Sequence, residues 1–282
     1  MYANWRLTLL VSAILIVVSC RKSKAPGIIN PGGSNDTLVV KPPEPEVYAQ
    51  NAVHTAIGTN VGGFYEALPP KYDVASSKKY PLLVFLHGGG ELGDGNEQLP
   101  LITHNALTKL LDRKKFPNSF TVNGEQFSFV IISPQFKAWP TVADVDKVID
   151  YSLSNYNVDT QRIYLSGLSM GGGATWEYAA DHGRELAAIV PICGASWATE
   201  AAATRLAATD VPIWAFHNKD DSSVSVRSTT RYLDFIKAAN PSYPYKLTLW
   251  ETGGHDAWTK STDPAYKEDG KNIYEWMLQF KR

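Results

Sequence analysis

The chain has 282 residues, of which 44% are hydrophobic and 20% are charged, and its formal net charge is -1. This length fits one large domain better than two, because α/β sheets of more than about 200 residues commonly form a single unit. A nearly neutral chain without a basic cluster lacks the positive surface that binds phosphate backbones. We therefore expect no nucleic-acid partner.

Residues 1–20 have the composition of an export signal, with Arg6 as the only charged side chain. The apolar run at residues 7–18 is shorter than the about 20 residues that cross a bilayer. It leads into Val17-Val18-Ser19-Cys20, which resembles a bacterial lipobox, whose cysteine carries lipid. We expect an exported lipoprotein, periplasmic or at the cell surface, anchored to a membrane through Cys20. An ordinary signal peptide with an incidental Cys20 is the alternative.

Residues 21–47 are rich in Pro, Gly, Ser, Asn and Lys, which predicts a flexible tether between the anchor and a domain at 48–282. Cys193 is the only other cysteine. If Cys20 carries lipid, no intrachain disulfide can form, and we expect Cys193 to be a small buried residue.

Beyond the tether, short apolar runs alternate with amphipathic stretches, which predicts an α/β fold with eight strands, mostly parallel, and helices on both faces. The first two strands have no helix between them and are expected to pair antiparallel. The predicted strands cover 54–59, 63–68, 80–86, 127–132, 162–166, 187–192, 213–216 and 246–251, and the predicted helices 99–111, 142–156, 170–182, 199–207, 225–239 and 271–280.

A candidate nucleophile lies in Gly167-Leu168-Ser169-Met170-Gly171, which matches the G-x-S-x-G nucleophile elbow. This motif needs a sharp turn between a strand and a helix, so that the serine hydroxyl projects above the sheet. The predicted strand 162–166 and helix 170–182 supply that context. We therefore expect Ser169 to be a nucleophile, with a structural glycine turn as the alternative.

A serine hydroxyl needs a general base within hydrogen-bond distance. His255 follows the last predicted strand, where the base of such a site belongs. The acid that orients the base should follow the preceding strand, and residues 213–224 supply Asp220 and Asp221. Related hydrolases usually carry His-Gly-x-x-Asp-x-x-Val there, which selects Asp221 when aligned on His217. Asp220 is then expected to be a solvated carboxylate, and His217 to orient the acid loop.

The stretch His87-Gly88-Gly89-Gly90-Glu91 follows the predicted strand 80–86 and suits an oxyanion hole. The expected donors are the backbone N–H groups of Gly89 and Met170. The stretch lacks the Gly-Lys-Ser/Thr ending of a phosphate-binding P-loop.

From about residue 47 onward the chain resembles bacterial esterases related to polyhydroxybutyrate depolymerases, feruloyl and acetylxylan esterases and dienelactone-hydrolase-like proteins, often labelled predicted peptidases. The resemblance implies the α/β-hydrolase fold and carboxylic-ester hydrolysis through an acyl-enzyme, without cofactor or metal. It does not select the ester. The matching stretches are 80–91 (YPLLVFLHGGGE), 130–135 (VIISPQ), 167–172 (GLSMGG), 188–194 (AIVPICG) and 253–258 (GGHDAW).

Four residues are candidates for substrate binding from their positions near strand ends, namely Gln135, Trp139, Trp197 and Trp258. Aromatic side chains suit a feruloyl group or a sugar ring, so we expect a small acyl ester, of a plant polysaccharide or a polyester. A serine peptidase of the prolyl-oligopeptidase type and a catalytically silent surface-binding lipoprotein remain alternatives. The oligomeric state is open.

Overall fold

The computed structural model describes residues 47–239 and 241–282. The expected signal peptide, its Cys20 and the tether up to residue 46 lie outside the described residues. Within the described part of the chain, no helix is both long enough and apolar enough to cross a membrane.

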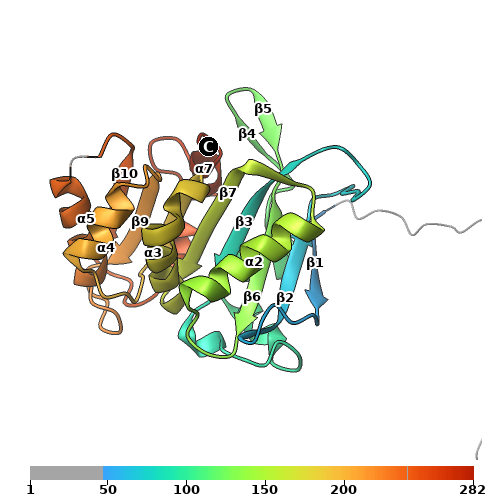
Figure 1. Ribbon diagram of the computed structural model, residues 1–282, viewed down its shortest axis with the longest axis horizontal. Helices are drawn as coiled ribbons and strands as arrows, with labels where there is room; N and C mark the ends of the chain where they lie inside the picture. Colours follow the sequence, from blue (N-terminus) through green and yellow to red (C-terminus); the bar gives the residue numbers. More distant parts are fainter. Residues whose placement is uncertain (1–46, 240) are drawn as a thin grey trace, which may run out of the picture. The chain divides into compact units, whose positions relative to one another are not determined.

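One sheet of eight strands organises the described residues, in the order β1-β2-β6-β3-β7-β8-β9-β10 (Figure 1). The strands from β6 to β10 in this order run parallel, while β2 pairs antiparallel with both β1 and β6. The prediction of a mostly parallel sheet with an antiparallel start is confirmed. The strands are β1 (Ala49–Val53), β2 (Val61–Leu68), β3 (Tyr80–Leu86), β6 (Val130–Phe136), β7 (Val158–Leu168), β8 (Ala188–Ile192), β9 (Ile213–Asn218) and β10 (Tyr245–Trp250).

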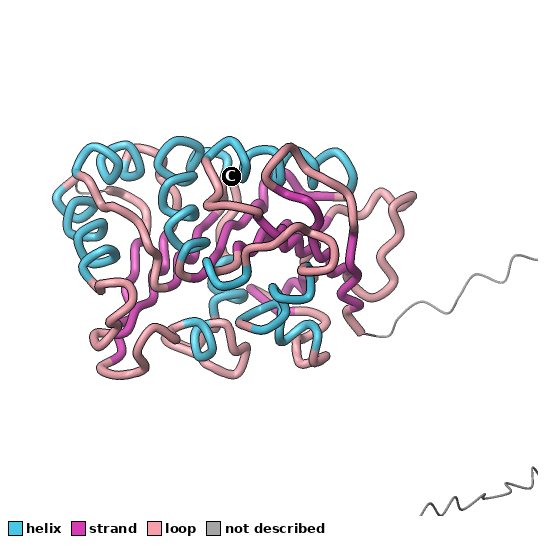
Figure 2. Tube along the Cα trace, turned by 90° about the horizontal axis from the view of Figure 1, so that it is seen from below, coloured by secondary structure: helices cyan, strands magenta, loops and turns pink. Residues whose placement is uncertain are grey.

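Helices cover both faces of this sheet (Figure 2). One hydrophobic core holds buried residues of α2, α3, α4 and α5, and the other holds those of α1 and α7. Alternate residues of β3 divide between the cores, because successive side chains of a strand point to opposite faces. The helices are α1 (Ala106–Asp112), α2 (Val142–Asn155), α3 (Met170–His182), α4 (Glu200–Ala207), α5 (Arg227–Ala238), α6 (Trp258–Ser261) and α7 (Ile273–Met277).

The largest differences from the sequence predictions lie before β6 and at the end of the chain. The first strand is Ala49–Val53 rather than 54–59, because it pairs residue by residue with β2 from Ala49↔Leu68 to Val53↔Phe64. The predicted helix 99–111 is divided into a 3-10 helix, Leu99–His104, and α1. The predicted strand 127–132 lies at Val130–Phe136 instead, and the predicted helix 271–280 shortens to α7.

A small hairpin of β4 (Phe120–Val122) and β5 (Glu125–Phe127) was not predicted. Its two-residue turn is Asn123-Gly124, with φ of 53° and 82°. Both residues are in the left-handed region, as the tight turns that suit hairpins require. This dipeptide was the signal that could have revealed the hairpin.

Candidate active site

Ser169 occupies the sharp turn between β7 and α3. Its φ of 52° and ψ of -115° are outside the ordinary regions for a non-glycine residue, a strain that costs about 1–3 kcal/mol. The turn also brings Gly171 against β3, since a Cβ there would lie 2.2 Å from the carbonyl oxygen of Leu86. The glycine of the motif is therefore required by close packing, and the packing holds the strained serine in place.

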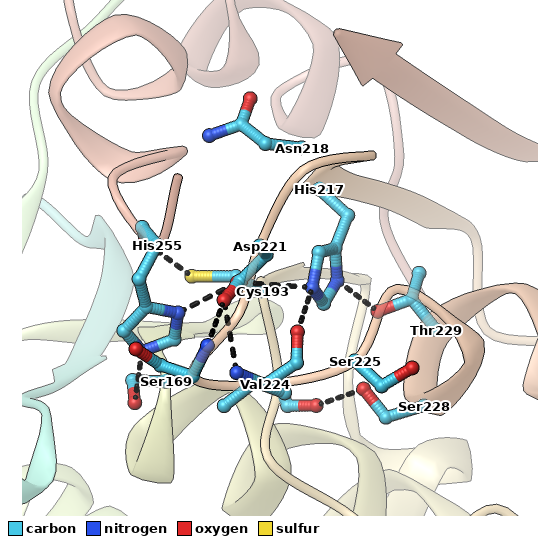
Figure 3. Close-up of polar contacts among 12 residues, drawn as sticks. Ser169, Cys193, His217, Asn218, Asp221, Val224, Ser225, Ser228, Thr229 and His255 are labelled. Atoms are coloured by element: carbon cyan, nitrogen blue, oxygen red, sulfur yellow. Dashed lines mark hydrogen bonds and ion pairs between the residues drawn. The ribbon is translucent and has the colours of Figure 1, made fainter. Parts of the chain in front are cut away.

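The structure brings Ser169, His255 and Asp221 together in a chain of hydrogen bonds (Figure 3). His255 Nε2 lies 2.8 Å from Ser169 Oγ, and His255 Nδ1 lies 2.7 Å from Asp221 Oδ2. The three residues follow the carboxyl ends of β7, β10 and β9, which lie at the same edge of the parallel sheet. This is the geometry in which a carboxylate orients an imidazole and the imidazole receives a serine proton.

Asp221 is held from two sides. Its Oδ1 accepts hydrogen bonds from the backbone N–H groups of Ser223 and Val224, each at 2.9 Å. Its Oδ2 also lies 3.2 Å from Nε2 of His217, whose side chain is fully buried. Burial lowers the pKa of His217, so its ring is neutral near pH 7.

The neutral ring of His217 has one donor nitrogen. Because Nε2 lies 3.0 Å from the carbonyl oxygen of Val224, which can only accept, the proton belongs on Nε2. Nδ1 then accepts from the hydroxyl of Thr229 at 2.9 Å. His217 thus bridges the acid loop and α5, as expected of a residue that orients the loop.

Asp220 differs from its expected role as a merely solvated carboxylate. It is exposed, but it accepts the backbone N–H groups of Gly253 at 3.2 Å and Gly254 at 2.8 Å, immediately before His255. Asn218, where related hydrolases carry glycine, donates from Nδ2 to the carbonyl oxygen of Gly254 at 3.0 Å. The acid loop therefore holds the histidine loop through two further side chains, a role that the sequence pattern did not reveal.

The glycine loop after β3 is fixed by buried polar groups. Glu91 accepts the N–H of Gly88 at 2.8 Å and a hydrogen bond from the amide of Asn105 at 2.9 Å. His87 lies between the carbonyl oxygen of Gly88, 2.7 Å from Nδ1, and the N–H of Phe136, 2.9 Å from Nε2. Burial lowers the pKa of His87 to about 4, so a neutral ring donates from Nδ1 and accepts at Nε2.

The two expected oxyanion donors begin helical turns. Gly89 is the first residue of a 3-10 turn and Met170 is the first residue of α3. N–H groups at such positions have no acceptor within their own helix. The N–H of Gly171 donates to the carbonyl oxygen of His87 at 3.1 Å, which joins the start of α3 to the glycine loop.

The four candidate substrate-binding residues have different surroundings. Trp258, in α6, meets His255 edge to face with 5.2 Å between the ring centroids. Trp197 is 84% exposed and lines a hollow of about 560 Å³ beside the acid loop. Trp139 is 49% exposed and follows β6.

Gln135 does not face a cleft, and the expectation that it binds substrate is corrected. Its side chain is fully buried in β6. Its amide nitrogen donates to the carbonyl oxygens of Glu91 at 3.0 Å and Gln98 at 2.7 Å, and its amide oxygen accepts the N–H of Gly95 at 2.8 Å. Gln135 uses its polar atoms to hold the loop that follows the glycine stretch.

Cys193 lies directly beneath the site. It is buried, its φ is 37°, and its thiol lies 3.5 Å from the carbonyl oxygen of His255. Burial raises the pKa of the thiol to about 12, so it is neutral near pH 7 and not a nucleophile. Cys193 forms no disulfide within the described residues.

Among residues 47–239 and 241–282, two groups of side chains have metal-ligand chemistry. One is Cys193 with Asp221 and His255, whose polar atoms already hydrogen-bond as described above. The other is Asp146, His182 and Glu185, on the side of the domain formed by α2 and α3. The first group shares Asp221 and His255 with the hydrogen-bond chain to Ser169, and the second has no residue in that chain.

Residues 73–267, more than half of the chain, match the phospholipase/carboxylesterase family. A bifunctional acetylxylan esterase/xylanase of Neocallimastix patriciarum is 33% identical over 89 residues, which cover 32% of this chain and 13% of that protein. A thermostable esterase of known structure is 26% identical with a TM-score of 0.60, over 83% of this chain and 63% of its own. The chain thus spans less than two thirds of the length of these two relatives.

A feruloyl esterase module from Clostridium thermocellum, solved with sinapinate, has a TM-score of 0.56 at 17% identity, over 74% of this chain and 81% of its own. At that identity the likeness concerns the fold alone. Together with the sheet order and the match over residues 73–267, these comparisons confirm the resemblance found in the sequence. The chain has the α/β-hydrolase fold and belongs to the phospholipase/carboxylesterase family.

Proposed function

We propose that the protein is a serine carboxylic-ester hydrolase that acts through an acyl-enzyme, with Ser169, His255 and Asp221 as its catalytic triad. The observation that carries the proposal is the continuous hydrogen-bond chain, 2.8 Å from Ser169 Oγ to His255 Nε2 and 2.7 Å from Nδ1 to Asp221 Oδ2. The family match and the esterases among the relatives support the same chemistry.

In the first half of the reaction, His255 Nε2 takes the proton of Ser169 Oγ as that oxygen attacks the ester carbonyl carbon. Asp221 stabilises the imidazolium that forms. The tetrahedral intermediate then collapses, the bond to the alcohol oxygen breaks, and His255 gives its proton to the leaving alcohol. The product of this half is the Ser169 acyl-enzyme and a free alcohol.

The negative oxygen of the intermediate is held by the N–H groups of Gly89 and Met170. The bond from Gly171 to His87 keeps the two segments in register, and Glu91 and His87 fix the glycine loop. Donors placed before the reaction need no rearrangement as charge develops. Loss of one such donor typically costs about 3 kcal/mol of transition-state stabilisation.

In the second half, water replaces the alcohol. His255 takes a proton from the water as its oxygen attacks the acyl carbon, and the bond to Ser169 Oγ breaks. Ser169 Oγ regains the proton from His255, and the carboxylic acid leaves. No step needs a group beyond the triad, the two N–H donors and water.

The substrates that we propose are feruloyl-type, acetyl or other small acyl esters, of plant polysaccharides or polyesters. The names of the acetylxylan esterase and the feruloyl esterase module support this class. Trp258 beside His255 and the exposed Trp197 offer aromatic faces for a phenolic acyl group or a sugar ring.

The test is a panel of esters given to the chain without residues 1–20: p-nitrophenyl acetate to octanoate, methyl ferulate, acetylated xylan and a polyester film. We expect turnover that Ser169→Ala abolishes, and the preferred ester then identifies the substrate class. Absence of turnover with every ester by a folded protein would overturn the proposal in favour of a peptidase or a silent binding protein.

We also propose that the protein is exported and held at a membrane by lipid on Cys20, on the strength of its lipobox-like sequence. A chain of this kind needs more than one acyl group for stable anchoring. Cells that express the full chain should incorporate labelled palmitate into it, and the Cys20→Ala chain should not be labelled. Equal labelling of both chains, or of neither, would contradict the proposal.

A further inference from the structure

The hollow of about 560 Å³ beside the triad is bounded by the loop after β8 and by the acid loop with the start of α5. Both walls are joined to the triad. The N–H of Ala195 donates to the carbonyl oxygen of Ser169 at 2.9 Å, and the N–H of Ser223 donates to Asp221 Oδ1 at 2.9 Å. The hydroxyl of Ser228 links the two walls by donating a hydrogen bond to the carbonyl oxygen of Gly194 at 2.8 Å. The hollow therefore lies next to the loops that hold Ser169 and Asp221 in place.

The lining of the hollow is largely apolar, with one large aromatic ring, several hydroxyl groups and a basic side. It contains two guanidinium groups and no carboxylate among the described residues. Hydroxyl groups and the exposed indole ring of Trp197 complete a surface that offers donors for an anion and an apolar face beside them. The lining residues that matter here are Ser196, Trp197, Ser223, Ser225, Arg227 and Arg231.

Arg227 and Arg231 do not serve the fold through ion pairs. Within the described part of the chain, neither has a carboxylate at salt-bridge distance, whereas Arg205 lies 2.9 Å from Asp181. The guanidinium of Arg231 instead lies over the ring of Phe235, 5.3 Å from its centroid. Two cations four residues apart on one helix repel each other, and a cation at the first residue of a helix, as Arg227 is, is also disfavoured. This charge is a local cost that an anionic ligand would remove.

We propose that the hollow is a subsite for a carboxylate group carried by the ester substrate, bound by Arg227 and Arg231 while Trp197 covers the adjoining part of the substrate. The inference rests on the proposed function, since it concerns the substrate of the same triad. A planar guanidinium presents paired donors that match the two oxygens of a carboxylate. The carboxylate belongs either to the acyl part or to the alcohol part of the ester.

Two matched pairs of esters separate these sources. Mono-p-nitrophenyl adipate and its methyl ester differ by one carboxylate on the acyl part, and 4-acetoxybenzoate and 4-acetoxybenzamide differ by one on the leaving group. In the pair whose carboxylate reaches the hollow, we expect the full chain to have a kcat/KM about tenfold higher for the acid than for its neutral partner. Arg227→Gln and Arg231→Gln should each abolish most of that ratio, and Arg227→Lys should retain part of it.

Lys237→Gln is the matched control. It removes the same charge from the last turn of α5, about 15 Å along the helix from Arg227, so a general field effect would lower the ratio there too. A wild-type ratio near one for both pairs, while the neutral esters are hydrolysed, overturns the subsite and leaves the esterase standing. An equal fall of the ratio in Lys237→Gln and in the arginine variants overturns it as well.

If no ester is hydrolysed, the proposed function is overturned. Calorimetry of ligand binding then still tests the subsite. The full chain should bind adipate better than adipamide, or 4-hydroxybenzoate better than 4-hydroxybenzamide, and Arg227→Gln should lose the difference. Equal binding of acid and amide in both series would overturn the subsite.

Discussion

The imidazole of His217 lies 3.2 Å from the carboxylate of Asp221, on the same oxygen that bonds His255. Both side chains are fully buried, so water does not compete for these contacts. A carboxylate with two fixed donors on one oxygen and two on the other has one orientation. His217 is therefore a positioning residue that acts on His255 through Asp221.

Replacement of His217 by phenylalanine should lower kcat about tenfold with little change in KM, because Asp221 loses a donor while the substrate surface is untouched. His217→Gln, whose amide can donate to the same oxygen, should recover much of the loss. Rates of p-nitrophenyl butyrate hydrolysis check this, with urea unfolding as a measure of folding. A change confined to KM, or no rescue by glutamine, would speak against the positioning role.

Substitution of the two neighbouring aspartates, Asp220 and Asp221, should affect activity very differently. Asp221→Asn removes the charge that stabilises the imidazolium and should lower kcat by about 10⁴. Gly253 and Gly254 donate to different oxygens of Asp220, so Asp220→Asn keeps an acceptor for one of these two bonds. Because Asp220 does not contact His255 directly, kcat should stay within about tenfold of the wild type. Comparable losses in both variants would show that the triad acid is wrongly assigned.

The folded protein should lose stability at low pH because His87 becomes protonated when the chain unfolds. Burial lowers its pKa from 6.5 to about 4, so between these values the unfolded chain binds more protons than the folded protein. The titration of His87 leaves the free energy of unfolding unchanged above about pH 6.5 and lowers it as the pH falls below that value. Below about pH 4 the decrease reaches its full size of about 3 kcal/mol.

Urea unfolding from pH 7 to pH 4 measures this decline. His87→Gln should flatten the dependence, and His54→Gln, which alters an exposed histidine, should leave it unchanged. An unaltered pH dependence in His87→Gln would contradict the assignment.

Alanine should be damaging at one glycine of the site, Gly171, and tolerated at another, Gly90. In Gly171→Ala the new Cβ would meet the carbonyl oxygen of Leu86 at 2.2 Å, so the start of α3 must move and soluble, active protein should be lost. In Gly90→Ala the new Cβ would meet no atom within 4 Å, and the melting temperature should change little. Thermal unfolding of both proteins decides, and a stable Gly171→Ala protein would show that this contact can relax.

The meeting of Ser169, His255 and Asp221 could be predicted from the sequence because these residues follow strand ends in a fixed chain order. The run of apolar residues at Tyr80–Leu86 and the glycines around Ser169 define a strand and a strand–turn–helix by local rules alone. Once the strands are parallel, their carboxyl ends meet at one edge, and His255 and Asp221 arrive there whatever the register of the other elements. The sequence therefore sufficed for the residues nearest the chemistry.

The supporting residues could not be predicted, because their roles depend on contacts between loops far apart in the chain. Gln135 follows the end of the predicted strand 127–132, as a cleft residue would. In the structure it lies within β6, paired with β2, and its amide bonds three backbone groups of another loop. Asp220 looks like any solvated carboxylate until the histidine loop is placed against it. No local pattern encodes either contact.

The strand that precedes His255, β10, is the last of the described strands and lies at the edge of the sheet, where β9 is its one described partner. Ser169, Asp221 and the glycine loop are all synthesised before it. A nascent or partly folded chain therefore cannot activate Ser169 until β10 has docked, and the onset of hydrolysis reports the completion of folding at that edge. We expect detachment of this strand to abolish hydrolysis, because His255 would leave Ser169.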